Sequence, residues 1–170
     1  MLSFRIRFAG LALVALLLGG CGFQPLYGDR SVNDDLASVE IGRISDRSGQ
    51  ELHNALLDRL NPKGAPARPL YQLLIELDEH LQDLAVRKNE SVTRYNLQIV
   101  ANYVLYSKAD GAVLVEGTSR STTSFNISTE EYSAIVAKQD AGRRGFDLLA
   151  DDIKLRLALF FRRIRSGTGG

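Results

Sequence analysis

The sequence predicts an α+β fold, a two-layer sandwich with two helices on one face of a four-stranded, mostly antiparallel sheet. Apolar and polar residues alternate through the centre of the chain, which is the period of half-buried strands. On either side, apolar residues recur every three or four positions, which is the period of helices. Asp110-Gly111 is a hairpin signal between two alternating runs. The expected element order is β-α-β-β-β-α.

The first strand and the first helix are expected near the start of the domain. The strand covers residues 36–44, where Val39 and Ile41 fall on one face. Ser48-Gly49-Gln50-Glu51 then has the pattern of a capping box that opens a helix. Proline lacks the backbone donor that a further turn would need, so Asn61-Pro62 ends this helix. The apolar residues at helical spacing are Leu52, Leu56, Leu57 and Leu60.

Three long strands are expected in the centre of the chain. The first begins at Tyr71 and extends toward Val86, and the third runs from Val113 to Phe125. The second ends near Ser107 and would span roughly 40 Å at about 3.3 Å per residue. We therefore expect an elongated domain in which strand bulges can occur. The apolar residues that share one face of the second strand are Tyr95, Leu97, Ile99, Ala101, Tyr103 and Leu105.

The last expected element is a long C-terminal helix. Ser128-Thr129-Glu130-Glu131 has the pattern of a second capping box at its start. Gly142 and Gly145 weaken the middle of this helix and favour a kink or a break there. Residues 166–170 are expected to form a disordered tail. The apolar stripe that should pack on the sheet contains Phe146, Leu149, Ile153, Leu157, Phe160 and Ile164.

The first 20 residues have the composition of a secretory signal peptide. Arg5 and Arg7 precede an apolar run over residues 8–18, and the small residues Gly19 and Gly20 follow that run. The run is about half of the roughly 20 residues that a membrane-spanning helix needs. We therefore interpret residues 1–20 as a cleaved export signal rather than a permanent membrane anchor.

Cys21 follows this signal directly and is the single cysteine of the chain. The ending Leu18-Gly19-Gly20-Cys21 resembles the lipobox of bacterial lipoproteins, in which the cysteine carries covalent lipid. Each buried methylene of such a lipid contributes about 0.8 kcal/mol, so two or three chains hold a protein firmly on a bilayer. The alternative is an ordinary secretory peptide that ends beside a free thiol. Residues 21–35 then read as a tether and residues 36–165 as a single domain.

Composition and motifs argue against nucleic-acid binding and against catalysis. Cleavage of the signal would leave 19 basic and 20 acidic residues, and this formal charge of −1 does not suit a general nucleic-acid binder. His53 and His80 have no cysteine or histidine at metal-ligand spacing, so we expect surface or boundary histidines. A helix directs Asp151 and Asp152 about 100° apart, which does not build a paired-carboxylate site. We expect no enzyme, and no cofactor apart from the covalent lipid on Cys21.

Two polar features remain. Residues 117–124 are polar on both faces of the expected third central strand, which suits either an edge strand kept soluble or a surface that lies against another polar wall. Basic residues also gather around the central strands. Arg94 and Arg120 could meet across neighbouring strands and hold phosphate groups, since guanidinium groups suit such ligands; solvated charges are the alternative. The other two basic residues of this group are Arg87 and Lys88.

The eight residues from Cys21 to Gly28, CGFQPLYG, resemble the mature N-terminus of the LPS-assembly lipoprotein (LptE-like) family, in particular its alphaproteobacterial branch. A lipobox requires none of Phe23, Pro25 and Tyr27, so the match adds to the signal itself. The resemblance implies two helices on a four-stranded sheet and no enzymatic activity.

The resemblance also implies a place and a partner. Such proteins sit in the Gram-negative outer membrane, plug the lumen of the LPS-assembly barrel LptD and help deliver lipopolysaccharide to the cell surface. Gly22, in place of an aspartate after the cysteine, favours the outer membrane as well. The alternative is a periplasm-facing lipoprotein that binds a cell-wall fragment or a small ligand. Under the first interpretation the candidate lipopolysaccharide contacts, assigned without a motif match, are Arg94, Arg120, Arg87 and Lys88.

Overall fold

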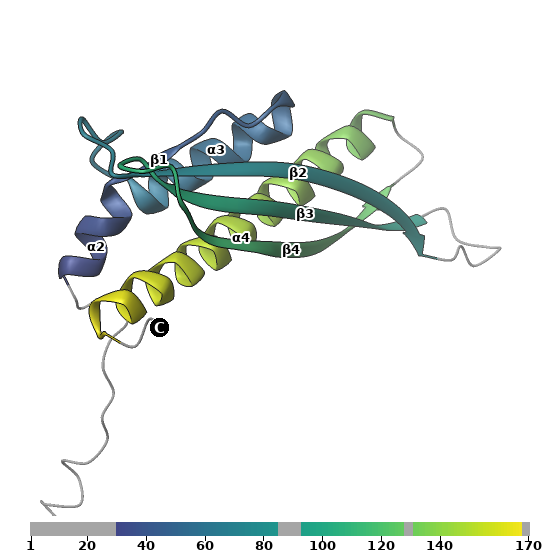
Figure 1. The fold of residues 1–170 in the computed structure, drawn as a ribbon. Coiled ribbons are helices and arrows are strands. Elements are labelled where there is room, and N and C mark those ends of the chain that lie inside the picture. The colour runs from purple at the N-terminus through teal and green to yellow at the C-terminus, as the bar shows by residue number, and fades with distance from the viewer. Residues whose placement is uncertain (1–29, 85–92, 128–130, 168–170) are drawn as a thin grey trace, which may run out of the picture.

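The computed structural model describes residues 30–84, 93–127 and 131–167 of the chain. Within these residues, three helices lie on one face of a four-stranded sheet, and the long strands give the molecule an elongated shape (Figure 1). The predicted fold class is confirmed. In chain order the elements are α2 (Arg30–Ala37), β1 (Val39–Ile41), α3 (Asp46–Leu60), β2 (Tyr71–Leu84), β3 (Thr93–Ser107), β4 (Val113–Ile127) and α4 (Glu131–Arg165).

The sheet has the strand order β1-β2-β3-β4. The short strand β1 pairs with β2 in parallel, and the other two pairings are antiparallel. The hairpin between β3 and β4 turns where the sequence predicts it, and Gly111 adopts the positive φ of 71° that such turns require. One bulge interrupts the pairing of these strands between Leu105 and Tyr106. The sheet is therefore mostly antiparallel, as predicted.

The core lies between the helices and the inner face of the sheet. The inner face of β3 carries the predicted apolar residues, and those from Leu97 to Leu105 are at most 3% exposed. Each large apolar side chain buried in this way stabilises the fold by about 1.5–3 kcal/mol. The fully buried residues that the helices contribute opposite them are Leu52, Leu56, Leu149, Ile153, Leu157 and Phe161.

The structure adds a helix that the sequence did not predict. Residues 30–37 form α2, although residues up to 35 were expected to be tether and residues 36–44 a strand. Val32 and Leu36 are 1% and 2% exposed, and their spacing of four places both on the face of α2 that packs against the domain. The expected first strand is consequently reduced to Val39–Ile41.

The start of α3 differs from the predicted capping box. The helix begins at Asp46, and Ser45 occupies the N-cap position in an extended conformation without a side-chain capping bond. Gly49 lies inside the helix, where a Cβ atom would come within 2.7 Å of Ile44 Cγ2. The glycine thus permits a close approach of α3 to the preceding loop. The predicted end at Asn61 is confirmed, because its backbone N–H closes the helix by donating to Leu57 O.

Helix α4 is a single helix of 35 residues, without a break at Gly142 or Gly145. Its buried face also deviates from the predicted stripe near the C-terminus. Phe161 is fully buried, with its ring centroid 4.9 Å from that of Tyr71, whereas Ile164 is 44% exposed. Phe160 is partly buried and packs against the core, as the predicted stripe requires, so the prediction missed Phe161 and was wrong at Ile164. The predicted capping box at 128–131 falls largely outside the described residues.

Candidate functional surfaces

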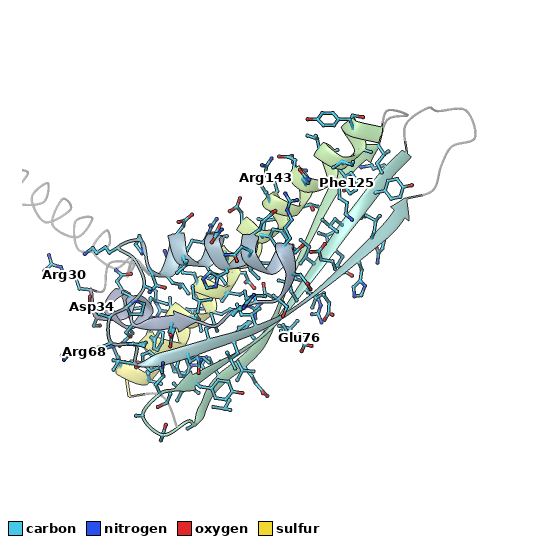
Figure 2. All side chains as sticks on the ribbon, turned by 90° about the horizontal axis from the view of Figure 1, so that it is seen from above. Arg30, Asp34, Arg68, Glu76, Phe125 and Arg143 are labelled. Atoms are coloured by element: carbon cyan, nitrogen blue, oxygen red, sulfur yellow. The ribbon has the colours of Figure 1, made fainter. Side chains whose placement is uncertain are left out.

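The helices cover one face of the sheet and leave the opposite face uncovered. On this open face no side chain of the described strands is fully buried, and Figure 2 shows Glu76 directed away from the helices. Strand alternation and register define its members. The open face consists of Gln72, Leu74, Glu76, Asp78, His80 and Gln82 of β2, Arg94, Asn96, Gln98, Val100, Asn102, Val104 and Tyr106 of β3, and Val113, Glu116, Thr118, Arg120, Thr122, Ser124 and Asn126 of β4.

Uncharged polar groups dominate the open face and bond to one another across strands. Thr118 Oγ1 donates to Asn102 Oδ1 at 2.8 Å, and Ser124 Oγ donates to Asn96 Oδ1 at 2.6 Å. Antiparallel sheets often leave one polar face in water, so solvation alone accounts for this composition. The same groups also retain unused donors and acceptors, which lets the face lie against a second polar surface.

The register separates Arg94 from Arg120. Arg94 is opposite Asn126 and Arg120 is opposite Val100, so the two arginines are offset by six residues along the sheet. At about 3.3 Å per residue this is roughly 20 Å. The prediction that the two side chains meet across neighbouring strands is therefore wrong, although both are exposed on the open face. A hairpin centred on residue 110 already fixes these pairings, so the sequence contained the signal.

Three of the predicted site residues fall outside the part of the chain that the structure describes. Cys21, Arg87 and Lys88 lie outside the described residues. Of the two histidines, His80 is exposed on the open face, and His53 is partly buried on α3. Both therefore occupy the surface or boundary positions that were expected. Across the described part of the chain, no group of three His, Cys, Asp or Glu side chains is arranged to hold a metal ion.

The polar strand β4 is an edge strand, as one of the two interpretations predicted. Its inner face is nevertheless buried, because α4 packs directly against it. Ser119 Oγ donates to Asp152 Oδ2 at 2.6 Å, and Thr123 Oγ1 donates to the carbonyl of Ala141 at 2.9 Å. Ser119 and Thr123 are only 1% and 7% exposed. Small hydroxyl side chains therefore form a polar seam between this strand and the helix.

Asp151 and Asp152 serve different partners, as their predicted divergence requires. Asp151 accepts from Arg59 Nε at 2.5 Å, and this bond is the largest cause of the raised pKa of the Arg59 guanidinium. Asp147 accepts from Arg59 Nη2 at 3.1 Å, so Arg59 ties α3 to α4. Asp152 instead faces β4 and also accepts from Arg156 Nε at 2.7 Å. The pair of Asp151 with Arg59 therefore joins α3 to α4, whereas the pair of Asp152 with Arg156 lies within α4 and Asp152 reaches β4 through its bond from Ser119.

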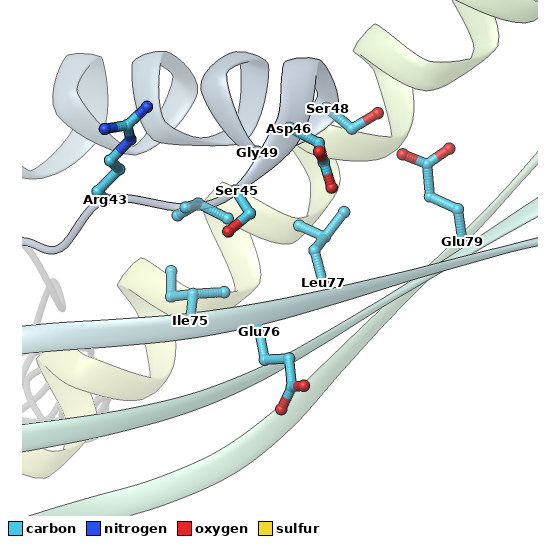
Figure 3. Close-up of a pocket in the computed structure, with 10 residues that line it drawn as sticks. Arg43, Ser45, Asp46, Ser48, Gly49, Ile75, Glu76, Leu77 and Glu79 are labelled. Carbon is cyan, nitrogen blue, oxygen red and sulfur yellow. The ribbon is translucent and has the colours of Figure 1, made fainter.

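A cavity of about 500 Å³ lies between the start of α3 and β2, beyond the end of β1 (Figure 3). Ile75 and Leu77 form an apolar side of it, whereas Glu76 points away toward the open face. Its lining contains charged and hydroxyl groups but no histidine, cysteine or lysine. The charged and hydroxyl residues that complete the lining are Arg43, Ser45, Asp46, Ser48 and Glu79.

No helix within the described ranges is both long and apolar enough to cross a membrane. The 35-residue helix α4 is amphipathic and carries charged residues throughout its length, which suits packing on the sheet.

Comparison with known proteins identifies the family. An uncharacterised protein of Rickettsia prowazekii is 28% identical over 159 residues, which cover 93% of this chain and 99% of that protein. A candidate lipoprotein of Caulobacter crescentus shares the fold, with a TM-score of 0.65, 24% identity and coverage of 77% of this chain and 96% of that one. A minor lipoprotein of Acinetobacter baumannii has a TM-score of 0.54 at 15% identity, and covers 71% and 91% of the two chains.

The decisive match is to a family model rather than to a single relative. The model of LptE, described as lipopolysaccharide-assembly, matches residues 36–157 and so spans β1 through most of α4. This range includes the whole sheet and the inner stretch of α4 that packs on it. The chain therefore belongs to the LptE lipopolysaccharide-assembly family.

Proposed function

We propose that this protein is an outer-membrane lipoprotein, anchored by lipid on Cys21, that forms a plug and scaffold complex with the LPS-assembly barrel LptD. In this role it has no catalytic activity and assists the transport of lipopolysaccharide to the cell surface. Membership of the LptE family supports the assembly role. The signal-like residues 1–20 and the lipobox-like ending before Cys21 support the anchor.

The open face is the observation that carries the plug proposal. The interior wall of a membrane barrel is polar, so a protein that fills it needs a long polar surface without a net excess of charge. The open face has these properties. It follows three strands of 14 or 15 residues, and its charged side chains of both signs lie among amides and hydroxyls. We therefore assign the open face as the surface that contacts the barrel wall.

Depletion of the protein in its own host tests the assembly function. We expect less lipopolysaccharide at the cell surface and less folded LptD, because the barrel loses its scaffold. Surface labelling of lipopolysaccharide and the heat-modifiable migration of the barrel measure the two effects. Re-expression of the wild-type chain is the control. Normal values of both quantities after depletion would reject the proposal.

Site-specific crosslinking tests the assigned surface separately. A photoreactive residue at Thr122 lies on the open face, whereas the same residue at Asn54 lies on the exposed side of α3. We expect capture of LptD from Thr122 and much weaker capture from Asn54. Equal or stronger capture from Asn54 contradicts the assignment of the open face. Capture of inner-membrane proteins alone contradicts the partner itself.

We also propose that Arg94 and Arg120 contact lipopolysaccharide, each as a separate site. A guanidinium holds a phosphate through charge-assisted hydrogen bonds, so replacement of either arginine with glutamine should weaken binding by about tenfold. Arg47→Gln is the matched control, since Arg47 is 79% exposed on the helix side of the sheet. Binding of purified lipopolysaccharide to each variant measures the effect. Equal losses in all three variants indicate a general charge effect and contradict these sites.

The cavity beside α3 supports a second candidate function, the binding of a cell-wall fragment or small ligand. Its volume of about 500 Å³ lies within the range of small-ligand sites, and Arg43 and Glu79 offer groups of both signs. Calorimetry with a muropeptide measures this directly. We expect the wild-type protein to bind the muropeptide and Arg43→Gln to bind it more weakly. The absence of measurable heat with the wild-type protein rejects this function.

A further inference from the structure

Four exposed arginines gather at one end of the molecule, which we call the basic end. Arg30 begins α2, and Arg162 and Arg163 lie in the last turn of α4. Figure 1 shows these two helix ends side by side, and Figure 2 shows Arg68 at the same end as Arg30. The backbone agrees, since Leu70 N donates to Ser38 O directly after α2. The basic end consists of Arg30, Arg68, Arg162 and Arg163.

An ion pair fixes the two helices of the basic end against each other. Arg165 of α4 donates from Nε to Asp35 Oδ2 at 2.6 Å and from Nη2 to Asp35 Oδ1 at 2.9 Å. Asp35 on α2 is only 7% exposed, so this two-pronged contact is shielded from solvent on one side. The helix ends that carry Arg30, Arg162 and Arg163 are consequently held against each other.

The described carboxylates near the basic end do not neutralise it. Asp35 is paired with Arg165, and Glu40 is paired with Lys108 Nζ at 2.5 Å. Among the residues that the structure describes, Asp34 of α2 and Asp110 of the turn after β3 are exposed carboxylates of this region, and they oppose four arginines. The basic end therefore keeps a positive charge, although the chain as a whole is nearly neutral. Ile164 lies among these charges and is 44% exposed, which adds an apolar side chain to the surface.

The chain outside the structure places the basic end near a bilayer. Cys21 precedes Arg30 by nine residues, which extend at most about 30 Å when fully stretched. Lipid on Cys21 therefore holds α2 within that distance of the leaflet that contains the lipid. Electrostatic attraction decays over about 8–10 Å at physiological ionic strength, so the arginines contribute only in contact with the surface.

We propose that the basic end binds the anionic phospholipid headgroups of the leaflet in which the lipid of Cys21 is inserted. This inference depends on the lipid anchor of the proposed function. The lipid and the arginines then form two signals that together orient the domain, as in other proteins that combine an acyl chain with basic residues. Arginine charge attracts the headgroups, and Ile164 enters the interface between them. The contact directs the length of α4 and of the sheet away from the membrane (Figure 1).

A single tryptophan tests the proposal, because the chain contains none. Ile164→Trp is introduced into the full lipidated protein, which is reconstituted through Cys21 into vesicles of phosphatidylcholine with or without phosphatidylglycerol. Phospholipid that is brominated near the top of its acyl chains quenches a tryptophan that has entered the interface below the headgroups. We expect quenching only with phosphatidylglycerol, and its reversal by high salt.

Charge variants on this background identify the residues. Arg162→Gln with Arg163→Gln should lower the contact equilibrium by about fivefold for each arginine removed. Arg47→Gln with Arg143→Gln is the matched control, because it removes the same charge from exposed sites elsewhere (79% and 66% exposed). Equal quenching in both vesicle types, or equal loss in both variant pairs, overturns the proposal.

Two further readouts keep the test independent of its assumptions. Hydrogen exchange over residues 160–165 of the wild-type protein should slow in vesicles that contain phosphatidylglycerol, so a folding defect of the tryptophan variant does not decide the result. A protein that fails to remain with vesicles of either composition lacks the lipid on Cys21, which contradicts the proposed anchor instead. Retention on the vesicles without quenching or slowed exchange overturns the inference about the basic end alone.

Discussion

Replacement by alanine should change the free energy of unfolding in different directions at Gly142 and at Gly145. Both lie inside α4, where alanine is favoured over glycine by about 1 kcal/mol. A Cβ atom on Gly142 would meet nothing closer than Phe146 Cε2 at 3.6 Å, which is an ordinary contact. Gly142→Ala should therefore raise the free energy of unfolding by about 1 kcal/mol.

Gly145 faces the sheet at much closer range. A Cβ atom there would lie 2.7 Å from Ile99 Cδ1 and 3.2 Å from Ser121 Oγ. Ile99 is fully buried, so its side chain has little room to move, and overpacking of a core costs about 1–3 kcal/mol. This cost offsets or exceeds the helix-propensity gain. We expect Gly145→Ala to be neutral or destabilising by up to about 2 kcal/mol.

Urea unfolding followed by circular dichroism measures both substitutions, with equal m-values as the check on two-state behaviour. A double variant sharpens the test. Ile99→Val alone should cost about 0.5–1.5 kcal/mol, but combined with Gly145→Ala it should cost less than the sum, because the lost Cδ1 makes room for the new methyl group. If Gly145→Ala stabilises as much as Gly142→Ala, the close approach of α4 to the sheet does not explain this glycine.

Three further predictions concern polar groups in the structure. Ser121 Oγ is buried without a hydrogen-bond partner, so Ser121→Ala should be neutral or stabilising by up to about 1 kcal/mol. Thr123→Ala should instead cost about 1 kcal/mol in the same urea assay, because it removes the bond to the carbonyl of Ala141. Arg165→Gln should cost about 1–3 kcal/mol and speed hydrogen exchange in α2, and unchanged exchange there contradicts the role of its pair with Asp35. Burial raises the pKa of Tyr103, although Arg156 partly opposes the shift. Its contribution to stability is therefore present below the unfolded-state pKa of about 10 and lost as pH rises through the higher folded-state pKa. Wild type should lose more stability than Tyr103→Phe between about pH 9 and about pH 11, and parallel curves refute this.

Some features of the candidate surfaces could be predicted from the sequence and others could not. The open face follows from strand alternation, because most of its positions in β2 and β3 carry polar residues, whereas the alternate positions of β3 are apolar. The separation of Arg94 and Arg120 was also accessible, since a hairpin centred on Asp110-Gly111 sets the register. The basic end could not be predicted from the sequence. It brings together residues more than 130 positions apart, and only the packing of α2 on the end of α4 makes them neighbours.

The sequence by itself determined the fold class, the long central strands and the resemblance carried by residues 21–28. Apolar periodicity reports burial directly, and every second residue from Tyr95 to Leu105 is apolar. The tertiary structure alone decided where polar and weakly patterned segments lie. Ser119 and Thr123 are buried although their strand is polar on both faces, because α4 supplies hydrogen-bond partners for them. Likewise α2 has too few apolar residues for their spacing to predict a helix, and its position depends on the distant Arg165. The spacing of apolar residues within a segment indicates which side of that segment is buried. The contacts of Ser119, Thr123 and α2 depend instead on partners in α4, which only folding brings close.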